Sequence, residues 1–155
     1  MLNTNSPLIT EFLKDHQQFS RLLLEISKLL DQNNLEKARQ RAKELNALAG
    51  PHIAFEEAEL YSRLIEMGER SITEAELVDQ HHSMRDALSE LLENPAPDAA
   101  TIASIKSGFR DALTHAEHCG TLISLVSRLD DEQQAKSLES LLRFRQQGTR
   151  WTDLG

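Results

Sequence analysis

Four of the six histidines in this chain have the spacing of residues on the buried face of a helix. Each lies three or four positions from apolar neighbours, as His16 does between Phe12 and Phe19, and residues so spaced share one helix face. The four are His16, His52, His81 and His115. Imidazoles that gather inside a helical core are suited to binding a transition metal.

The segment from His52 to Glu56 gives the sharpest local signal, because residues at i and i+4 lie one above the other on a helix. An imidazole nitrogen and a carboxylate in this arrangement can reach one metal, or the carboxylate can bridge two. Burying a glutamate is costly unless it is paired or coordinates a metal. Imidazole and carboxylate ligands suit iron, zinc or manganese, so the pair predicts a site for such a metal.

A simpler interpretation is open for each of these residues taken alone. A histidine on an apolar face is usually a core residue with satisfied hydrogen bonds. It is the occurrence of four such histidines on four helices, together with Glu56, that favours a metal site. Glu57 and Glu59 are expected to be solvated charges, and His82 is expected to point away from the face of His81.

The fourth histidine has two neighbours that are additional candidates for the site. His118 follows His115 by three positions and can share its helix face. Cys119 follows His115 by four positions, where the earlier motif has Glu56 after His52. Two interpretations of Cys119 stay open: a small buried apolar residue, or a thiolate near the metal.

The apolar spacing along the chain predicts an all-α fold, an up-down-up-down four-helix bundle with a short fifth C-terminal helix. The helices are expected from Pro7, capped by Ser6, to the turn at 31–34; from Leu35 to Gly68; from a capping box at 71–74 to the prolines at 95 and 97; from Asp98 to Leu129; and over 131–147. Pro51 lies inside the second helix and should kink or restart it.

One domain is expected over residues 1–155, with its core at roughly 6–130 and the C-terminal helix at 131–147. The tail from Gly148 to Gly155 is expected to be loose, with Trp151 as the residue able to dock.

Composition restricts the partners and the location. The formal net charge of −8 opposes binding to nucleic acid. No uncharged apolar run approaches the roughly 18 residues needed to cross a bilayer, and the first residues lack the features of a signal peptide. A single cysteine excludes an intrachain disulfide. We expect a cytoplasmic protein without a membrane partner, and leave open a homo-oligomer or another protein partner.

Together these motifs resemble the hemerythrin-like, or HHE cation-binding, family over about the first 130 residues. The matching pieces, in helix order, are Asp15–His16, His52-x-x-x-Glu56-Glu57, His81 with Arg85, and His115. The resemblance implies a bundle with a non-haem di-iron centre, held by histidines and bridged by carboxylates, with an open position for O2, NO or a related ligand. The implied ligands are His16, His52, Glu56, His81 and His115.

Two positions depart from the pattern of this family. Its second bridging carboxylate would fall at Cys119, and a second histidine of the third helix would fall at Arg85. A mononuclear site, a zinc or manganese site, or a centre completed by His118, solvent or Cys119 therefore stays an alternative to two iron ions.

The sequence supports three hypotheses for function. The first is a protein that binds or senses O2, NO or peroxide at two iron ions and is not an enzyme. The second is a metal-dependent redox enzyme or an iron-delivery or repair factor. The third is a helical interaction protein with a degenerate metal site. Ferritin-like di-iron enzymes use Glu-x-x-His pairs, and no glutamate here lies three residues before a histidine.

Overall fold

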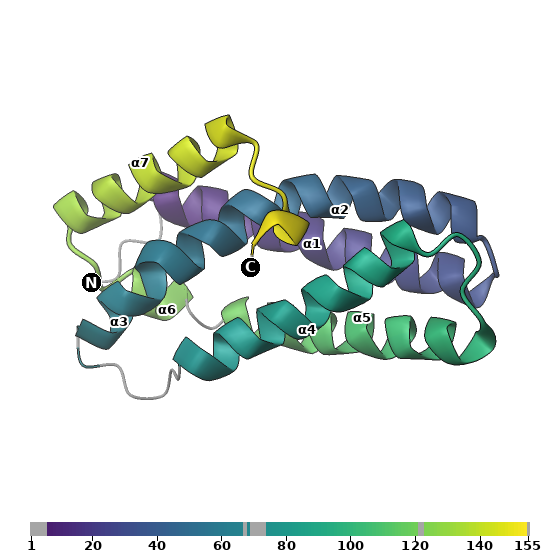
Figure 1. The fold of residues 1–155 in the computed structure, drawn as a ribbon. Helices are drawn as coiled ribbons and strands as arrows, with labels where there is room; N and C mark the ends of the chain where they lie inside the picture. Colours follow the sequence, from purple (N-terminus) through teal and green to yellow (C-terminus); the bar gives the residue numbers. More distant parts are fainter. Residues whose placement is uncertain (1–5, 67, 69–73, 121–122, 155) are drawn as a thin grey trace.

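The structure is a computed structural model, and it describes residues 6–66, 68, 74–120 and 123–154, without the side chains at 64, 74–76 and 116–120. Figure 1 shows an arrangement of helices that confirms the predicted all-α fold. The elements are α1 (Pro7–Asp31), α2 (Leu35–Phe55), the π-helix η1 (Glu56–Leu60), α3 (Tyr61–Glu66), α4 (Glu74–Glu93), α5 (Ala99–Gly120), α6 (Ile123–Val126), α7 (Asp131–Gln147) and the 3-10 helix η2 (Trp151–Asp153).

Four of these helices form the predicted bundle. Helix α1 packs against α2 and α5, and α4 packs against the same two helices, so each long helix lies between two neighbours (Figure 1). The predicted fifth helix is α7, which covers α2 and α1 from outside. Short connections between consecutive long helices make them run up and down in turn.

Local capping explains why several helices begin where the sequence predicted. The Ser6 hydroxyl accepts a hydrogen bond from the Ile9 amide at 3.2 Å, and Pro7 occupies the first turn of α1. The Asp98 carboxylate accepts one from Thr101 at the start of α5. Asp130 caps α7 through a capping box. The capping box expected at 71–74 falls mostly outside the described residues.

Two expected helices differ from the structure in their extent. The second is continuous through Pro51, so the proline does not restart it, and the helix then passes through η1 into α3. The fourth was expected to reach Leu129. The structure instead describes α5 to Gly120 and the separate short helix α6 from Ile123.

The C-terminal tail is docked, where a loose tail was expected. Trp151 is 4% exposed and belongs to the apolar core. Asn46 and Thr152 exchange two hydrogen bonds of 3.0 and 2.9 Å, and Arg85 donates one to the Leu154 carbonyl. The tail therefore docks through Trp151, the one residue expected to be able to do so. Burial of the indole stabilises this position, and hydrogen bonds of the neighbouring Thr152 and Leu154 add to it.

The core consists of two apolar clusters with a polar layer between them. On α1, Phe12 belongs to one cluster and Phe19 to the other, and His16 lies between them. On α4, His81 occupies the same intermediate position. The bundle therefore holds its candidate site between two apolar regions that exclude water.

Among the helices described, none is both long and apolar enough to cross a membrane.

Candidate metal centre

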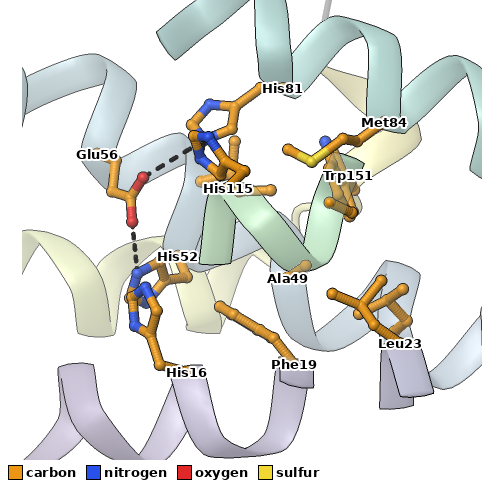
Figure 2. A pocket seen from close by; sticks show the side chains of 13 residues that line it. His16, Phe19, Leu23, Ala49, His52, Glu56, His81, Met84, His115 and Trp151 are labelled. Atoms are coloured by element: carbon orange, nitrogen blue, oxygen red, sulfur yellow. Dashed lines mark hydrogen bonds and ion pairs between the residues drawn. The ribbon is translucent and has the colours of Figure 1, made fainter. Parts of the chain in front are cut away.

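The structure brings together the five residues that the sequence singled out. His52, Glu56, His81 and His115 are buried, and His16 is partly buried. Figure 2 shows the imidazoles of α1, α2, α4 and α5 turned toward the Glu56 carboxylate. Their donor atoms form two groups in which all atoms lie within 4.8 Å of one another: His16 with His52 and Glu56, and His81 with His115 and Glu56.

Glu56 belongs to both groups because its two oxygens face opposite sides. Oε1 lies 2.7 Å from His52 Nε2, and Oε2 lies 3.5 Å from His81 Nε2 (Figure 2). The carboxylate is 1% exposed, so its charge requires a compensating cation. A carboxylate with one oxygen in each group has the placement of a ligand that bridges two metals.

Each of the four histidines at the site has an acceptor at its Nδ1 atom, which orients the ring. The four contacts are His16 to the Phe12 carbonyl at 2.9 Å, His52 to Asp15 at 2.8 Å, His81 to Glu57 at 2.9 Å, and His115 to the Gln80 amide oxygen at 2.5 Å. We assign the proton of each neutral ring to Nδ1 on this basis. The Nε2 lone pairs are then available to a metal, the usual arrangement for ligating histidines.

Two contacts of the Nε2 atoms need a proton or a metal ion between the atoms that they join. His81 Nε2 lies 2.8 Å from His115 Nε2, so two lone pairs face each other in these tautomers. His52 Nε2 lies 2.7 Å from Glu56 Oε1 but lacks hydrogen-bond geometry. Lone pairs at these separations repel unless a proton or a metal ion lies between them. The donor set therefore fits a bound cation.

The electrostatics of the site favour positive charge. Burial alone would lower the pKa of His52, but the negative charges of Glu56 and Asp15 outweigh burial and raise that pKa to about 9. Burial raises the pKa of Glu56, yet His52, His81 and His16 lower it well below its usual value, so the carboxylate is ionised. Burial and the neighbouring His52 lower the pKa of His16. Without a metal, the site therefore holds an ionised Glu56 and a protonated His52 at neutral pH, and a bound metal would take the place of the His52 proton.

Aromatic side chains hold the first group in place. The Phe12 ring centroid lies 4.5 Å from that of His16 and 4.6 Å from that of His52, and Phe19 lies 5.1 Å from His52. These contacts restrict the two imidazoles to one orientation, which reduces the cost of ordering them when a metal binds.

A cavity of about 30 Å³ adjoins both groups. Its remaining lining is apolar: Phe19, Leu23, Leu45, Ala49, Ile53, Met84, Ala112 and Trp151 (Figure 2). One water needs roughly 10–15 Å³ of such volume, so the cavity has room for about two water-sized molecules and for no larger ligand.

Sequence reasoning missed several residues that position the site. Glu57 was expected to be solvated, but it accepts the His81 Nδ1 proton. Glu59, also expected in solvent, is 24% exposed and bonds Ser140 of α7. Asp15 was noted only through the family resemblance. Asp15 orients His52, because its carboxylate accepts hydrogen bonds from His52 of α2 and from Arg145 of α7. Both partners are on other helices, so the local sequence pattern does not reveal them.

Two more participants follow from contacts that no local pattern reveals. Tyr61 donates a hydrogen bond of 2.5 Å to Glu56 Oε2, and Gln80 accepts one from His115. Arg85 binds the tail instead of the site. The side chains of His118 and Cys119 lie outside the described part of the chain, so both stay predictions.

The comparison with known families agrees with this geometry. Residues 8–128 match the model of the hemerythrin HHE cation-binding domain. Comparisons with curated proteins and with solved structures gave no match. The family model spans most of the chain, and the inward histidines with Glu56 give it candidate cation ligands. The chain therefore belongs to the hemerythrin HHE cation-binding domain family.

Proposed function

We propose that this protein holds two iron ions in its core and binds or senses O2, NO or a related small redox ligand there. The observation that carries the proposal is the pair of donor groups that share Glu56, one made with His16 and His52, the other with His81 and His115. Each group would bind one metal through two imidazoles, and Glu56 would bridge the two metals.

The donor chemistry supports iron. Two histidines and one carboxylate, with further positions open, form the set that non-haem iron(II) proteins use. Zinc also accepts two histidines and a glutamate as ligands. Elemental analysis of the purified protein therefore distinguishes iron from zinc.

The cavity supports a small ligand. Three protein ligands leave a metal with an open position, and iron supplies reversible binding of diatomic molecules there. The apolar lining formed by Phe19, Leu23, Met84 and Trp151 would favour an uncharged ligand and keep bulk water out. This environment supports binding or sensing more than steady turnover.

Iron stoichiometry in matched variants tests the two-metal arrangement. We expect two iron ions per chain in the wild type and one in either His52→Ala or His115→Ala, because each variant removes a ligand from one group only. Glu56→Gln should lose both ions, since it removes the shared carboxylate. Glu59→Gln changes a carboxylate three residues after Glu56 that bonds Ser140 of α7, so it is the control and should keep both ions.

Two outcomes would overturn the proposal. Fewer than one metal per wild-type chain would exclude a resident centre, and two iron ions retained by Glu56→Gln would exclude bridging by Glu56. For the ligand, the optical spectrum of the iron-loaded protein should change stoichiometrically on exposure to air or NO. Steady consumption of peroxide or NO would instead support an enzyme.

A further inference from the structure

Tyr61 places a phenol oxygen beside the second group of donor atoms, the one formed by Glu56, His81 and His115. Its side chain is fully buried. The hydroxyl lies 2.5 Å from Glu56 Oε2 and 3.4 Å from His81 Nε2. The Tyr61 and His81 rings are stacked with centroids 6.0 Å apart. The phenol oxygen therefore faces the same region as the second group of donors.

The π-helix explains how Tyr61 reaches that region. In an α-helix each residue turns by about 100°, so a residue at i+5 points roughly 140° away from residue i, while i+4 shares its face. Tyr61 is at i+5 from Glu56. The backbone widens here, and the Tyr61 amide donates to the Glu56 carbonyl, an i to i+5 bond. The extra residue moves Tyr61 under Glu56, and such turns are frequent at functional sites.

The distances fit donors of one metal. Ligands about 2.1 Å from a metal lie roughly 3.0–3.4 Å apart at octahedral or tetrahedral angles. Four pairs of these atoms are 2.5 Å apart for Tyr61 with Glu56, 3.4 Å for Tyr61 with His81, 3.5 Å for Glu56 with His81, and 2.8 Å for His81 with His115. The last three distances lie within a few tenths of an ångström of that range, and Tyr61 and Glu56 would move apart by about 0.5 Å once a metal replaced the proton between them.

We propose that Tyr61 is an oxygen ligand of the metal held by Glu56, His81 and His115. The inference rests on the proposed iron function and goes further by making the two metals unequal. The metal would replace the proton that lies between Tyr61 and Glu56, and that proton would pass to solvent. The second metal would have two nitrogen and two oxygen ligands from the protein, and the first would have three ligands and be the more open.

The chain contains one tyrosine, which makes the test specific. Protein loaded with iron(III) should show a visible phenolate-to-iron charge-transfer band. Resonance Raman spectra excited in that band should show phenolate ring modes that shift when the protein is made with ring-deuterated tyrosine. This measurement uses the wild-type chain and does not depend on the folding of a variant.

Tyr61→Phe removes only the hydroxyl. We expect the band to disappear and the affinity for the second iron to fall by roughly 10- to 100-fold or more, while the first iron stays bound. Ser137→Ala removes another fully buried hydroxyl, on α7, and should leave band and stoichiometry unchanged.

The outcomes separate this inference from the function on which it rests. Two bound iron ions without tyrosine modes in the wild type would overturn the Tyr61 assignment and leave the di-iron proposal standing, with Tyr61 as a hydrogen-bond donor to Glu56. A wild-type chain that binds no iron would overturn both. A tyrosine-sensitive band that is lost in Tyr61→Phe and kept in Ser137→Ala would support both.

Discussion

At the scale of single residues, the side chains behind the histidines matter as much as the histidines. Asp15 and Glu57 accept the Nδ1 protons of His52 and His81. Such acceptors fix the tautomer and make the imidazole a stronger ligand. Asp15 is also held by Arg145, so α7 reaches the metal site through one intervening carboxylate.

Glu57→Gln tests this role at His81. The amide weakens acceptance of the Nδ1 proton, so we expect iron(II) affinity to fall roughly 10- to 100-fold without loss of the fold. Affinity is measured by competition with a chelator. Glu59→Gln is the control, because it removes the charge of a nearby carboxylate. The described hydrogen bonds of Glu59 are with Ser140 and Arg143, and neither is a histidine. Equal losses in the two variants would show that general charge, and not the contact with His81, governs binding.

At the scale of elements, the contact between α2 and the tail is the most demanding sterically. A Cβ on Gly50 would lie 2.1 Å from the Thr149 carbonyl oxygen and 2.6 Å from the Arg150 carbonyl carbon. Both partners are backbone atoms that cannot rotate away. Gly50 therefore allows the tail to approach closely enough for Trp151 to reach the cavity wall.

Gly50→Ala should destabilise the protein, although alanine is the better helix former by about 1 kcal/mol. We expect a net loss of about 1–3 kcal/mol from overpacking, and release of Trp151 into solvent. Trp151 is the single tryptophan, so a red-shifted emission reports its release.

Gly108→Ala is the matched control for this substitution. Its Cβ would lie 2.4 Å from the Ala87 side chain, between α4 and α5. It should lower stability and leave the emission unchanged. Unchanged emission in Gly50→Ala would contradict the role given to that glycine.

At the scale of the whole molecule, the polar layer divides the core into two apolar clusters. The clusters supply the hydrophobic burial that folds the chain, while the layer places ionised and polar groups where water is scarce. A metal that binds only the folded state offsets the cost of that layer.

Iron loading should therefore raise the melting temperature. A ligand at a thousand times its Kd adds about 4 kcal/mol, which is roughly 10 °C for a domain of this size. Thermal unfolding with and without iron(II), followed by circular dichroism, measures the shift. Glu56→Gln should show little increase because it lacks the shared ligand. A wild-type melting temperature indifferent to iron and to chelator would support the degenerate-site hypothesis.

The sequence by itself determined the local features. Ser6 and Asp98 mark helix starts through capping, and the three- and four-residue spacing turns His16 and His81 inward. These features depend on contacts within one or two helical turns, so the local pattern is sufficient to predict them. The fold class and the residues that gather around Glu56 followed from them.

Only the tertiary structure decided which partner each group has. Asp15 reaches His52 because of how α1 and α2 are rotated and staggered, and local spacing carries no information about that packing. A π-turn brings Tyr61 under Glu56, where an α-helical pattern places Leu60. Trp151 completes the cavity because Gly50 lets two distant segments touch. These features depend on atoms far apart in the chain, and such contacts exist only once the helices have packed.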